Sequence, residues 1–222
     1  MKVNNKKSFK FFLWPALYLL LAVGICVFTQ AIFNANYYSN FYVSGESMSP
    51  TLNGDADDAD YGTYDGHNIA IKNVRRFQIV TTHYPSERTL PEEKKTLKIK
   101  RLLFKPGDTF EVVYLEEQGK NEMHLFENAT SDNYTVLEFP FNTSHIKESH
   151  TYPKTTLSST QYFVAGDNWD RSSDSFDEGV GPLEFTDLVG VVTKVEGRCK
   201  VVDKKITDKR PYAVKIFNGV DY

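Results

Sequence analysis

The chain has 222 residues, of which 41% are hydrophobic and 25% are charged, and its formal net charge is −3. This composition fits one globular domain with a small subdomain. Its 16 Phe and 13 Tyr residues favour a mostly β fold, because aromatic side chains suit a pleated, half-buried surface. The acidic balance argues against a nucleic-acid partner, because phosphate binding requires a basic face.

The first predicted element is a transmembrane helix over residues 11–33. This apolar run of 23 residues would be about 34 Å long as a helix, and the hydrocarbon core of a membrane is roughly 30 Å thick. Basic but no acidic residues precede the run, which predicts a cytoplasmic segment 1–10 and an extracytoplasmic remainder of a single-pass protein of the cell membrane. The basic residues are Lys2, Lys6, Lys7 and Lys10.

A cleaved secretory signal is the alternative interpretation of the same run. The apolar core of such a signal has roughly 7–15 residues and ends in small residues at the cleavage site. The run here is longer, and Phe33 stands where a cut after Ala35 would need a small side chain, so a permanent anchor is favoured. Cys26 lies inside the run and Cys199 in the outer part, so we do not expect these two cysteines to pair.

Beyond the anchor, the sequence predicts short strands separated by turns and few helices. The Gly- and Asp-rich segment 53–66 lacks periodicity and is expected to be a loop. In "KPGD", Pro106 and Gly107 occupy the central positions of a type II turn, after which residues 109–117 are expected to return as the partner of strand 96–104. The predicted strands cover residues 40–45, 68–73, 75–84, 96–104, 109–117, 161–168 and 187–197.

Two later segments depart from this strand pattern. From residue 117 to 160 the pattern weakens into polar loops with short strands, which indicates an inserted cap. The charged segment 203–222 forms a tail that is expected to be poorly ordered at its end.

Common metal and cofactor sites find no support in the sequence, which has neither a Walker-type phosphate loop nor a G-x-G-x-x-G motif. His145 and His150 form an H-x4-H pair without cysteines or a helical context, so no zinc site is expected. The acidic run over residues 55–60 does not fit an EF-hand loop and is interpreted as a solvated loop. We therefore predict neither a metal nor a cofactor.

A serine within "SGESMSPT" (residues 44–51) is a candidate nucleophile, and it needs a base to take its proton. "GESMS" resembles the G-x-S-x-G elbow of α/β-hydrolases, but its last position is Ser49 and the alternating β/α pattern is absent. A lysine base requires its pKa to fall by about three units, or about 4 kcal/mol, which burial can supply. Alternation in "KIKRLLF" places Lys100 on the same face as Leu102 and Phe104.

Three sequence blocks taken together resemble bacterial type I signal peptidases. They are "SGESMSPT", "KIKRLLFKPGD" and "GDNWDRSSDS", in this order after one membrane anchor. The resemblance implies a coiled β-sheet catalytic core over residues 34–110 and 160–196. It also implies a small inserted β subdomain over 111–159 and a C-terminal tail over 197–222.

The resemblance also implies the roles of individual residues. Ser47 matches the nucleophile, Lys100 matches the general base, and Ser44 matches the hydroxyl that helps the Ser47 N–H to bind the oxyanion. Ser172 matches the serine that orients the lysine, and Met48 would line the substrate groove. Asp174 and Ser175 match the residues that hold the loop near the lysine.

The chain departs from the family pattern at a few positions. Trp169 and Phe176 stand where the family usually has arginines, and Phe77 with Gln78 replaces an expected Gly-Asp turn. In the family the aspartate matching Asp174 pairs with the arginine that is replaced here by Phe176. Arg101 and Arg171 are the candidates to substitute for that arginine.

The function that the resemblance implies is a membrane-bound serine endopeptidase. Such an enzyme removes signal peptides from exported preproteins after a small residue, through an acyl-enzyme, with membrane lipid and the secretion machinery as further partners. The alternative is a catalytically impaired relative that binds surface proteins and assists their assembly. A self-cleaving repressor is disfavoured by the anchor and by the lack of a basic DNA-reading helix.

Overall fold

A computed structural model describes residues 6–219. The described residues fall into two units that meet between Ser39 and Asn40. The first unit is dominated by the helix α1 (Lys6–Tyr37), which contains Pro15. Its segment Leu13–Ile32 has a mean hydropathy of 2.0 and no buried side chains. This helix is long and apolar enough to cross a membrane and fits a single-pass membrane protein, as predicted.

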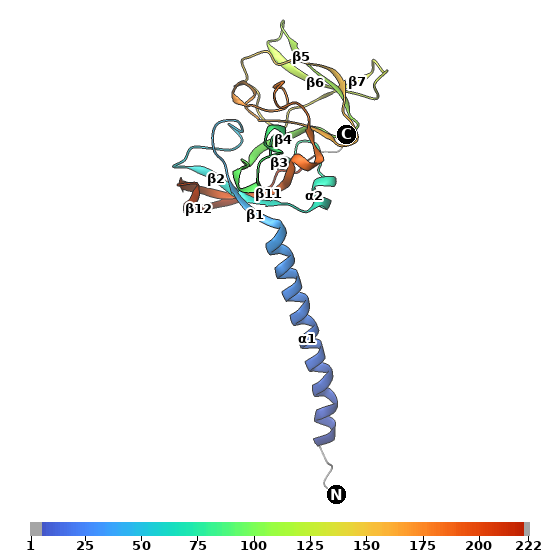
Figure 1. Cartoon of the computed structure of the whole chain (residues 1–222), viewed down its shortest axis with the longest axis vertical. Coiled ribbons are helices and arrows are strands. Elements are labelled where there is room, and N and C mark those ends of the chain that lie inside the picture. Colours follow the sequence, from blue (N-terminus) through green and yellow to red (C-terminus); the bar gives the residue numbers. More distant parts are fainter. Residues whose placement is uncertain (1–5, 220–222) are drawn as a thin grey trace. The chain divides into compact units, whose positions relative to one another are not determined.

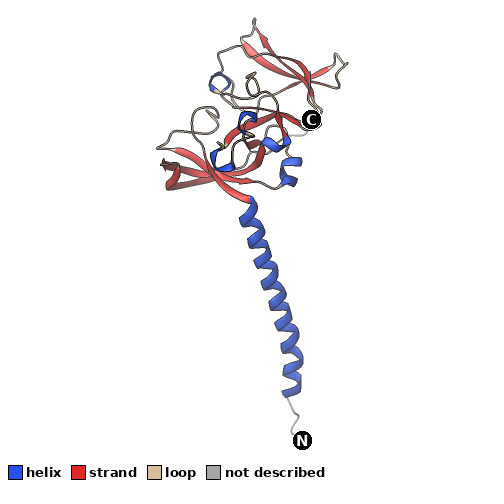
Figure 2. Ribbon diagram, viewed as in Figure 1, coloured by secondary structure: helices blue, strands red, loops and turns tan. Residues whose placement is uncertain are grey.

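The second unit is mostly β, which confirms the predicted fold class (Figures 1 and 2). Its larger sheet has eight strands in the order β1-β2-β11-β3-β4-β9-β10, with β12 paired to β11. The strands are β1 (Tyr38–Tyr42), β2 (Ala59–Asp65), β3 (Ile79–Thr82), β4 (Lys98–Phe104), β9 (Gln161–Ala165), β10 (Leu183–Glu184), β11 (Leu188–Val202) and β12 (Lys205–Lys215).

A second sheet of four strands is formed by the chain between β4 and β9, in the order β7-β6-β5-β8. Its strands are β5 (Thr109–Leu115), β6 (Lys120–Phe126), β7 (Tyr134–Leu137) and β8 (Tyr152–Thr156). We call the segment 109–156 the insertion, because it leaves the larger sheet after β4 and returns to it at β9. The short helices are α2 (Asn68–Lys72), η1 (Pro85–Glu87), η2 (Glu92–Lys94), η3 (Trp169–Arg171) and η4 (Phe185–Asp187).

Two segments differ from the predicted secondary structure. Residues 68–73 were expected to be a strand but form α2, in which Ile71 is buried and Ile69 is 69% exposed. So short a run of apolar residues does not separate a period of 2 from one of 3.6. Residues 53–66 were expected to be a loop but contain β2, which pairs with β11. Pairing within the sheet overrides the low strand propensity of Gly and Asp there.

The chain also pairs differently from the prediction after the "KPGD" turn. Gly107 has φ +84° and the Asp108 N–H donates to Lys105 O (3.1 Å), as a type II turn requires. However, β5 pairs with β6 and β8, whereas β4 pairs with β3 and β9. The turn therefore leads from one sheet into the other. The charged strand β12 was not predicted at all.

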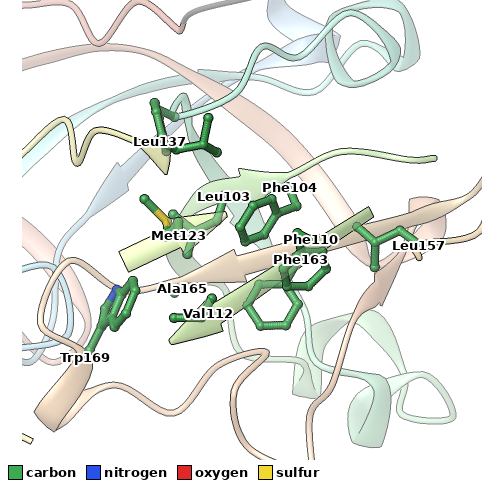
Figure 3. Close-up of a cluster of buried hydrophobic side chains, with 11 residues drawn as sticks. Leu103, Phe104, Phe110, Val112, Met123, Leu137, Leu157, Phe163, Ala165 and Trp169 are labelled. Carbon is green, nitrogen blue, oxygen red and sulfur yellow. The ribbon is translucent and has the colours of Figure 1, made fainter. Parts of the chain in front are cut away.

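The core that joins the two sheets combines aromatic rings with aliphatic side chains (Figure 3). Phe104 of β4 stacks on Phe110 of β5 with ring centroids 3.8 Å apart, and Phe163 of β9 meets Phe110 edge-on at 4.9 Å. Each ring is fully buried, which stabilises the fold by about 2–3 kcal/mol per side chain. Trp169, which follows β9, belongs to the same cluster, so the loop after β9 is attached to this core.

Candidate active site

Ser47 lies on a tight turn that follows β1. The turn is closed by hydrogen bonds from Ser49 N–H to Glu46 O (3.0 Å) and from Leu52 N–H to Met48 O (2.9 Å). Met48 and Leu52 are completely buried beside Val43 and Ile79, whereas Ser47 is partly exposed. The sequence thus fixes the turn by inserting its neighbouring apolar side chains into the core, and this leaves the serine at the surface.

Met48 has no exposed surface. Its side chain anchors the turn, and its predicted contact with a substrate stays a prediction. Ser44, the predicted oxyanion donor, is exposed just before the turn. It is separated from Ser47 by Gly45 and Glu46, and the φ of +84° at Gly45 lies in the left-handed region that favours glycine.

Lys100 lies on β4 between β3 and β9, and it is only 3% exposed. Its Nζ donates a hydrogen bond to Ser172 Oγ at 2.8 Å. The pKa of the Lys100 amine is lowered to about 8, chiefly by burial and to a smaller extent by Lys98, while nearby carboxylates oppose this shift. These carboxylates belong to Asp174, Asp177 and Asp167. With a pKa near 8, about a tenth of the amine is neutral at pH 7.

The loop of residues 166–176 forms a hydrogen-bond network around Lys100. The Gly166 N–H donates to Ser172 Oγ (3.1 Å) and to Asp174 Oδ2 (2.9 Å), and the Ser172 hydroxyl is hydrogen-bonded to the Asp174 carboxyl. Burial raises the pKa of Asp174, and these hydrogen bonds and Lys100 oppose that rise. Ser175 Oγ accepts a hydrogen bond from the Val164 N–H (3.0 Å), which ties the loop back to β9.

Gly166 is the point at which the serine turn and the lysine network meet. A Cβ atom at this position would lie 2.2 Å from Ser47 O and 2.4 Å from Ser172 Oγ, so only glycine fits. Asn168, two residues further along the loop, also binds the serine turn. Its N–H donates to Ser47 O (2.9 Å) and its Nδ2 donates to Glu46 O (3.2 Å). Ser47 is thus held beside the group that binds the Lys100 amine.

The arginine that follows Lys100 forms a buried ion pair with the same loop. Arg101 donates from Nε and Nη2 to the two carboxylate oxygens of Asp167, at 2.7 Å and 2.6 Å, and from Nη1 to Phe77 O at 2.6 Å. Arg171 pairs instead with Glu46 (3.1 Å). Neither arginine therefore pairs with Asp174, whose Oδ1 accepts a backbone hydrogen bond from Phe176 N–H (3.2 Å).

The three departures from the family pattern each have a structural counterpart. Trp169 and Phe176 contact one another, with ring centroids 4.7 Å apart, so an aromatic pair stands where two arginines were expected. Phe77 adopts φ +68°, the left-handed conformation for which a glycine is the usual residue. Its side chain is buried, which offsets the cost of that conformation.

A polar cleft of about 740 Å³ adjoins the serine turn. Its walls come from the turn (Gly45, Glu46 and Ser49), from the acidic loop, and from the loop after β9 (Asn168 and Arg171). The acidic run 55–60 is only partly solvated, because Asp60 is 1% exposed and its carboxylate binds the Asn53 N–H (2.8 Å).

Several residues of this region were not singled out from the sequence. Gly166, Asp167 and Asn168 lie inside the "GDNWDRSSDS" block, so the signal was present, but their partners were not visible. The partners are backbone atoms of Ser47 and Glu46 and the side chain of Arg101, which come from other parts of the chain.

Among the described residues the fold is mostly β, one helix is long and apolar enough to cross a membrane, and a serine turn lies beside a buried lysine. These features fit a single-pass membrane peptidase. The chain matches the family described as signal peptidase, peptidase S26, over residues 15–195. It therefore belongs to the signal peptidase family, as its sequence blocks predicted, and membership indicates a peptidase.

Two bacterial relatives support this assignment. The chain is 32% identical over 165 residues to Signal peptidase I P of Bacillus subtilis subsp. natto, a match that covers 69% of this chain and 74% of the relative. It is 25% identical over 193 residues to Signal peptidase I of Bacillus licheniformis, covering 85% of this chain and 89% of the relative.

Proposed function

We propose that this protein is a membrane-bound serine endopeptidase that removes signal peptides from exported preproteins after a small residue. Ser47 is the nucleophile and Lys100 is the general base. The observation that carries the proposal is the buried Lys100 amine, which has a pKa near 8 and is bound to Ser172 beside the Ser47 turn. A lysine held in this way serves as a base near neutral pH.

The first half of the reaction is acylation. Neutral Lys100 takes the proton from Ser47 Oγ as this oxygen attacks the scissile carbonyl. The oxyanion that forms is stabilised by the Ser47 N–H and the Ser44 hydroxyl, and one such donor typically contributes about 3–4 kcal/mol. The Lys100 ammonium then gives its proton to the amine that leaves as the new N-terminus of the mature protein.

The second half is deacylation, in which Lys100 takes a proton from water as the water oxygen attacks the acyl carbon. The ester bond to Ser47 Oγ then breaks, the signal peptide leaves with a free carboxyl end, and Lys100 returns the proton to Ser47 Oγ. Ser172 accepts one N–H of the amine in both halves, which leaves the lone pair of the neutral amine for Ser47 or water. Asp174 and Ser175 hold the loop that carries Ser172. No step calls for a metal or a cofactor.

The substrate is an extended signal peptide that adds as a further strand beside β1. This strand is terminal in the larger sheet, where it pairs with β2, and peptides commonly bind as an added strand at the edge of a sheet. The edge leads directly into the Ser47 turn. Residues 34–110 and 160–196 form the catalytic core, and 111–159 form a non-catalytic subdomain.

Residues 11–33 anchor the enzyme in the cell membrane, with residues 1–10 in the cytoplasm and the core outside. This arrangement brings the site to the membrane lipid and the secretion machinery, where preproteins emerge. A binding or assembly factor without activity is not favoured, because the Trp169 and Phe176 substitutions leave the Lys100–Ser172 hydrogen bond intact.

Cleavage of a reporter preprotein by the full chain in detergent tests the proposal. We expect Ser47→Ala and Lys100→Met to abolish cleavage, and Lys100→Arg to do the same because a guanidinium stays charged. Ser159→Ala, an exposed serine outside the serine turn and the cleft, is the control and should retain activity. Cleavage by Ser47→Ala at the wild-type rate would exclude the proposed nucleophile.

A further inference from the structure

A segment of the insertion, residues 145–150, lies along the loop of residues 167–170. The carboxylate of Asp170 receives hydrogen bonds from Lys147 N–H (2.6 Å) and Glu148 N–H (3.2 Å), and its Oδ1 lies 3.0 Å from His150 Nε2. His145 Nε2 lies 2.9 Å from Asp167 O. One carboxylate of the loop thus binds three groups of the insertion.

The Asp170 carboxylate is well shielded from solvent. The side chains of Asp170 and His150 are each 15% exposed. Burial raises the pKa of the Asp170 carboxyl, but the hydrogen bonds from Lys147, His150 and Glu148 outweigh it and bring the pKa below its ordinary value. Asp170 is therefore an anion at neutral pH, and hydrogen bonds to an anion are about twice as strong as neutral ones.

Aromatic contacts reinforce the same junction. Trp169, next to Asp170 in the loop, packs against Phe139 (5.1 Å between ring centroids) and against the edge of the His150 ring (5.6 Å). Phe176, at the other end of the loop, lies 5.9 Å from His150. His150 thus contacts the loop through both its N–H group and its ring.

The loop held in this way carries the groups that shape the candidate active site. Asn168, two residues before Asp170, binds Ser47 O, and Ser172, two residues after it, binds the Lys100 amine. A shift of the loop at Asp170 would therefore move the partners of both proposed catalytic residues. Misplacement by about 1 Å typically lowers a rate by about 100-fold.

We propose that Asp170 is a positioning residue, through which the insertion holds the active-site loop so that Ser172 orients Lys100 and Asn168 fixes Ser47. This inference rests on the proposed function for its catalytic consequence. Asp170 touches neither the reacting atoms nor the substrate strand. The insertion thereby supports the active site without supplying a catalytic residue, because the partners of the Asp170 carboxylate are Lys147, Glu148 and His150.

Glu148, His150 and Asp170 each have an atom that could bind a metal ion, and these three atoms lie within 4.8 Å of one another. Both oxygens of Asp170 already accept backbone hydrogen bonds from the insertion. The cluster therefore acts as a junction of hydrogen bonds between the loop and the insertion.

The test compares Asp170→Asn with the wild type in the full chain in detergent. The variant keeps the size of the side chain but removes its charge and replaces an acceptor with a donor. We expect kcat to fall by about 10- to 100-fold while KM changes by less than about threefold. Asp132→Asn, an exposed aspartate of the same insertion, is the matched control and should leave both constants unchanged.

The pH profile separates positioning from a merely structural role. If the loop loosens, water reaches Lys100, which is surrounded by Asp174, Asp177, Asp167 and Lys98. The loss of desolvation then raises the pKa of the amine, and the midpoint of the rising limb of kcat should move up by about 0.5–1 pH unit. A folded Asp170→Asn with the wild-type midpoint, or with unchanged kcat, would overturn the proposal.

A second variant tests the proposal if Asp170→Asn does not fold, and hydrogen exchange tests it without a cleavage assay. His150→Phe keeps the ring contacts with Trp169 and Phe176 but loses one hydrogen bond, so it should fold even if Asp170→Asn does not and should lower kcat by about 2- to 5-fold. Amide hydrogen exchange at Gly166 and Asn168 should quicken in both variants, whether or not the protein cleaves preproteins. Unchanged exchange would refute the positioning role, whereas failure of cleavage by the wild type would refute only the proposed function.

Discussion

The loop of residues 166–176 is held in two different ways on its two sides. On one side, Asp167 forms a buried, bidentate ion pair with Arg101, which also binds the backbone of Phe77. On the other side, Trp169 and Phe176 form an aromatic cluster with the insertion. Paired charges are directional and costly to separate when buried, whereas ring contacts tolerate small changes of shape.

The difference explains how the chain dispenses with two arginines of its family pattern. A buried arginine at 169 or 176 would need a carboxylate with good geometry. Asp167 is already bound by Arg101, and Asp174 is satisfied by Gly166 N–H, Phe176 N–H and the Ser172 hydroxyl. Large apolar side chains fill the remaining space without adding an unpaired charge.

Breaking the charged side should have the largest effect. Arg101→Met leaves the Asp167 carboxylate buried without its partner, which should lower the free energy of unfolding by about 3–5 kcal/mol. Urea unfolding of the full chain in detergent, followed by tryptophan fluorescence, measures this loss. Arg171→Met provides the control, since the side chains of Arg171 and its partner Glu46 are 70% and 66% exposed and an exposed pair contributes about 0–1 kcal/mol. An equal loss of unfolding free energy in the two variants would show that the buried ion pair of Arg101 contributes no more than an exposed one.

The backbone of Phe77, on the same side, gives the second test. Phe77→Ala removes a buried ring and should cost about 3–4 kcal/mol of unfolding free energy. Phe77→Gly removes the same ring but relieves the strain of φ +68°, so it should be more stable than Phe77→Ala by about 1 kcal/mol. This order is the reverse of the usual preference for Ala over Gly, and urea unfolding of both variants measures it. A more stable alanine variant would show that the left-handed conformation carries no strain.

The pH dependence of cleavage reports on the charges around Lys100. The neutral amine is the active form, and its pKa lies near 8, below its ordinary value. The neutral fraction therefore rises with pH, from about a tenth at pH 7 to about nine tenths at pH 9, and kcat/KM should rise about tenfold over this range. Initial rates on a reporter preprotein between pH 6 and 10 test the sign and the midpoint. A rate that falls as the pH rises through 8 would contradict a neutral lysine base.

The fold class and the family could be predicted from the sequence, because the apolar run and the three blocks are local patterns. The sequence predicted neither β2 nor α2, since the pairing of β2 with β11 and the burial of Ile71 depend on distant segments. The contacts of Asp170 with the insertion could not be predicted from the sequence either. Its partners include two backbone N–H groups more than 20 residues away, and a backbone donor leaves no trace in residue type.

The aromatic side should be the more tolerant one, and Phe176→Leu should have the smallest effect. Phe176 is only partly buried, and leucine retains much of its apolar contact with Phe163 and Trp169. The free energy of unfolding should therefore fall by about 1 kcal/mol. Since no charge near Lys100 changes, the pH midpoint of cleavage should match that of the wild type. Unfolding in urea and a pH profile on the same preparation measure both quantities. A shifted midpoint with this small loss of stability would mean that the aromatic cluster also sets the pKa of Lys100, and the contrast between the Arg101–Asp167 ion pair and the ring contacts would then fail.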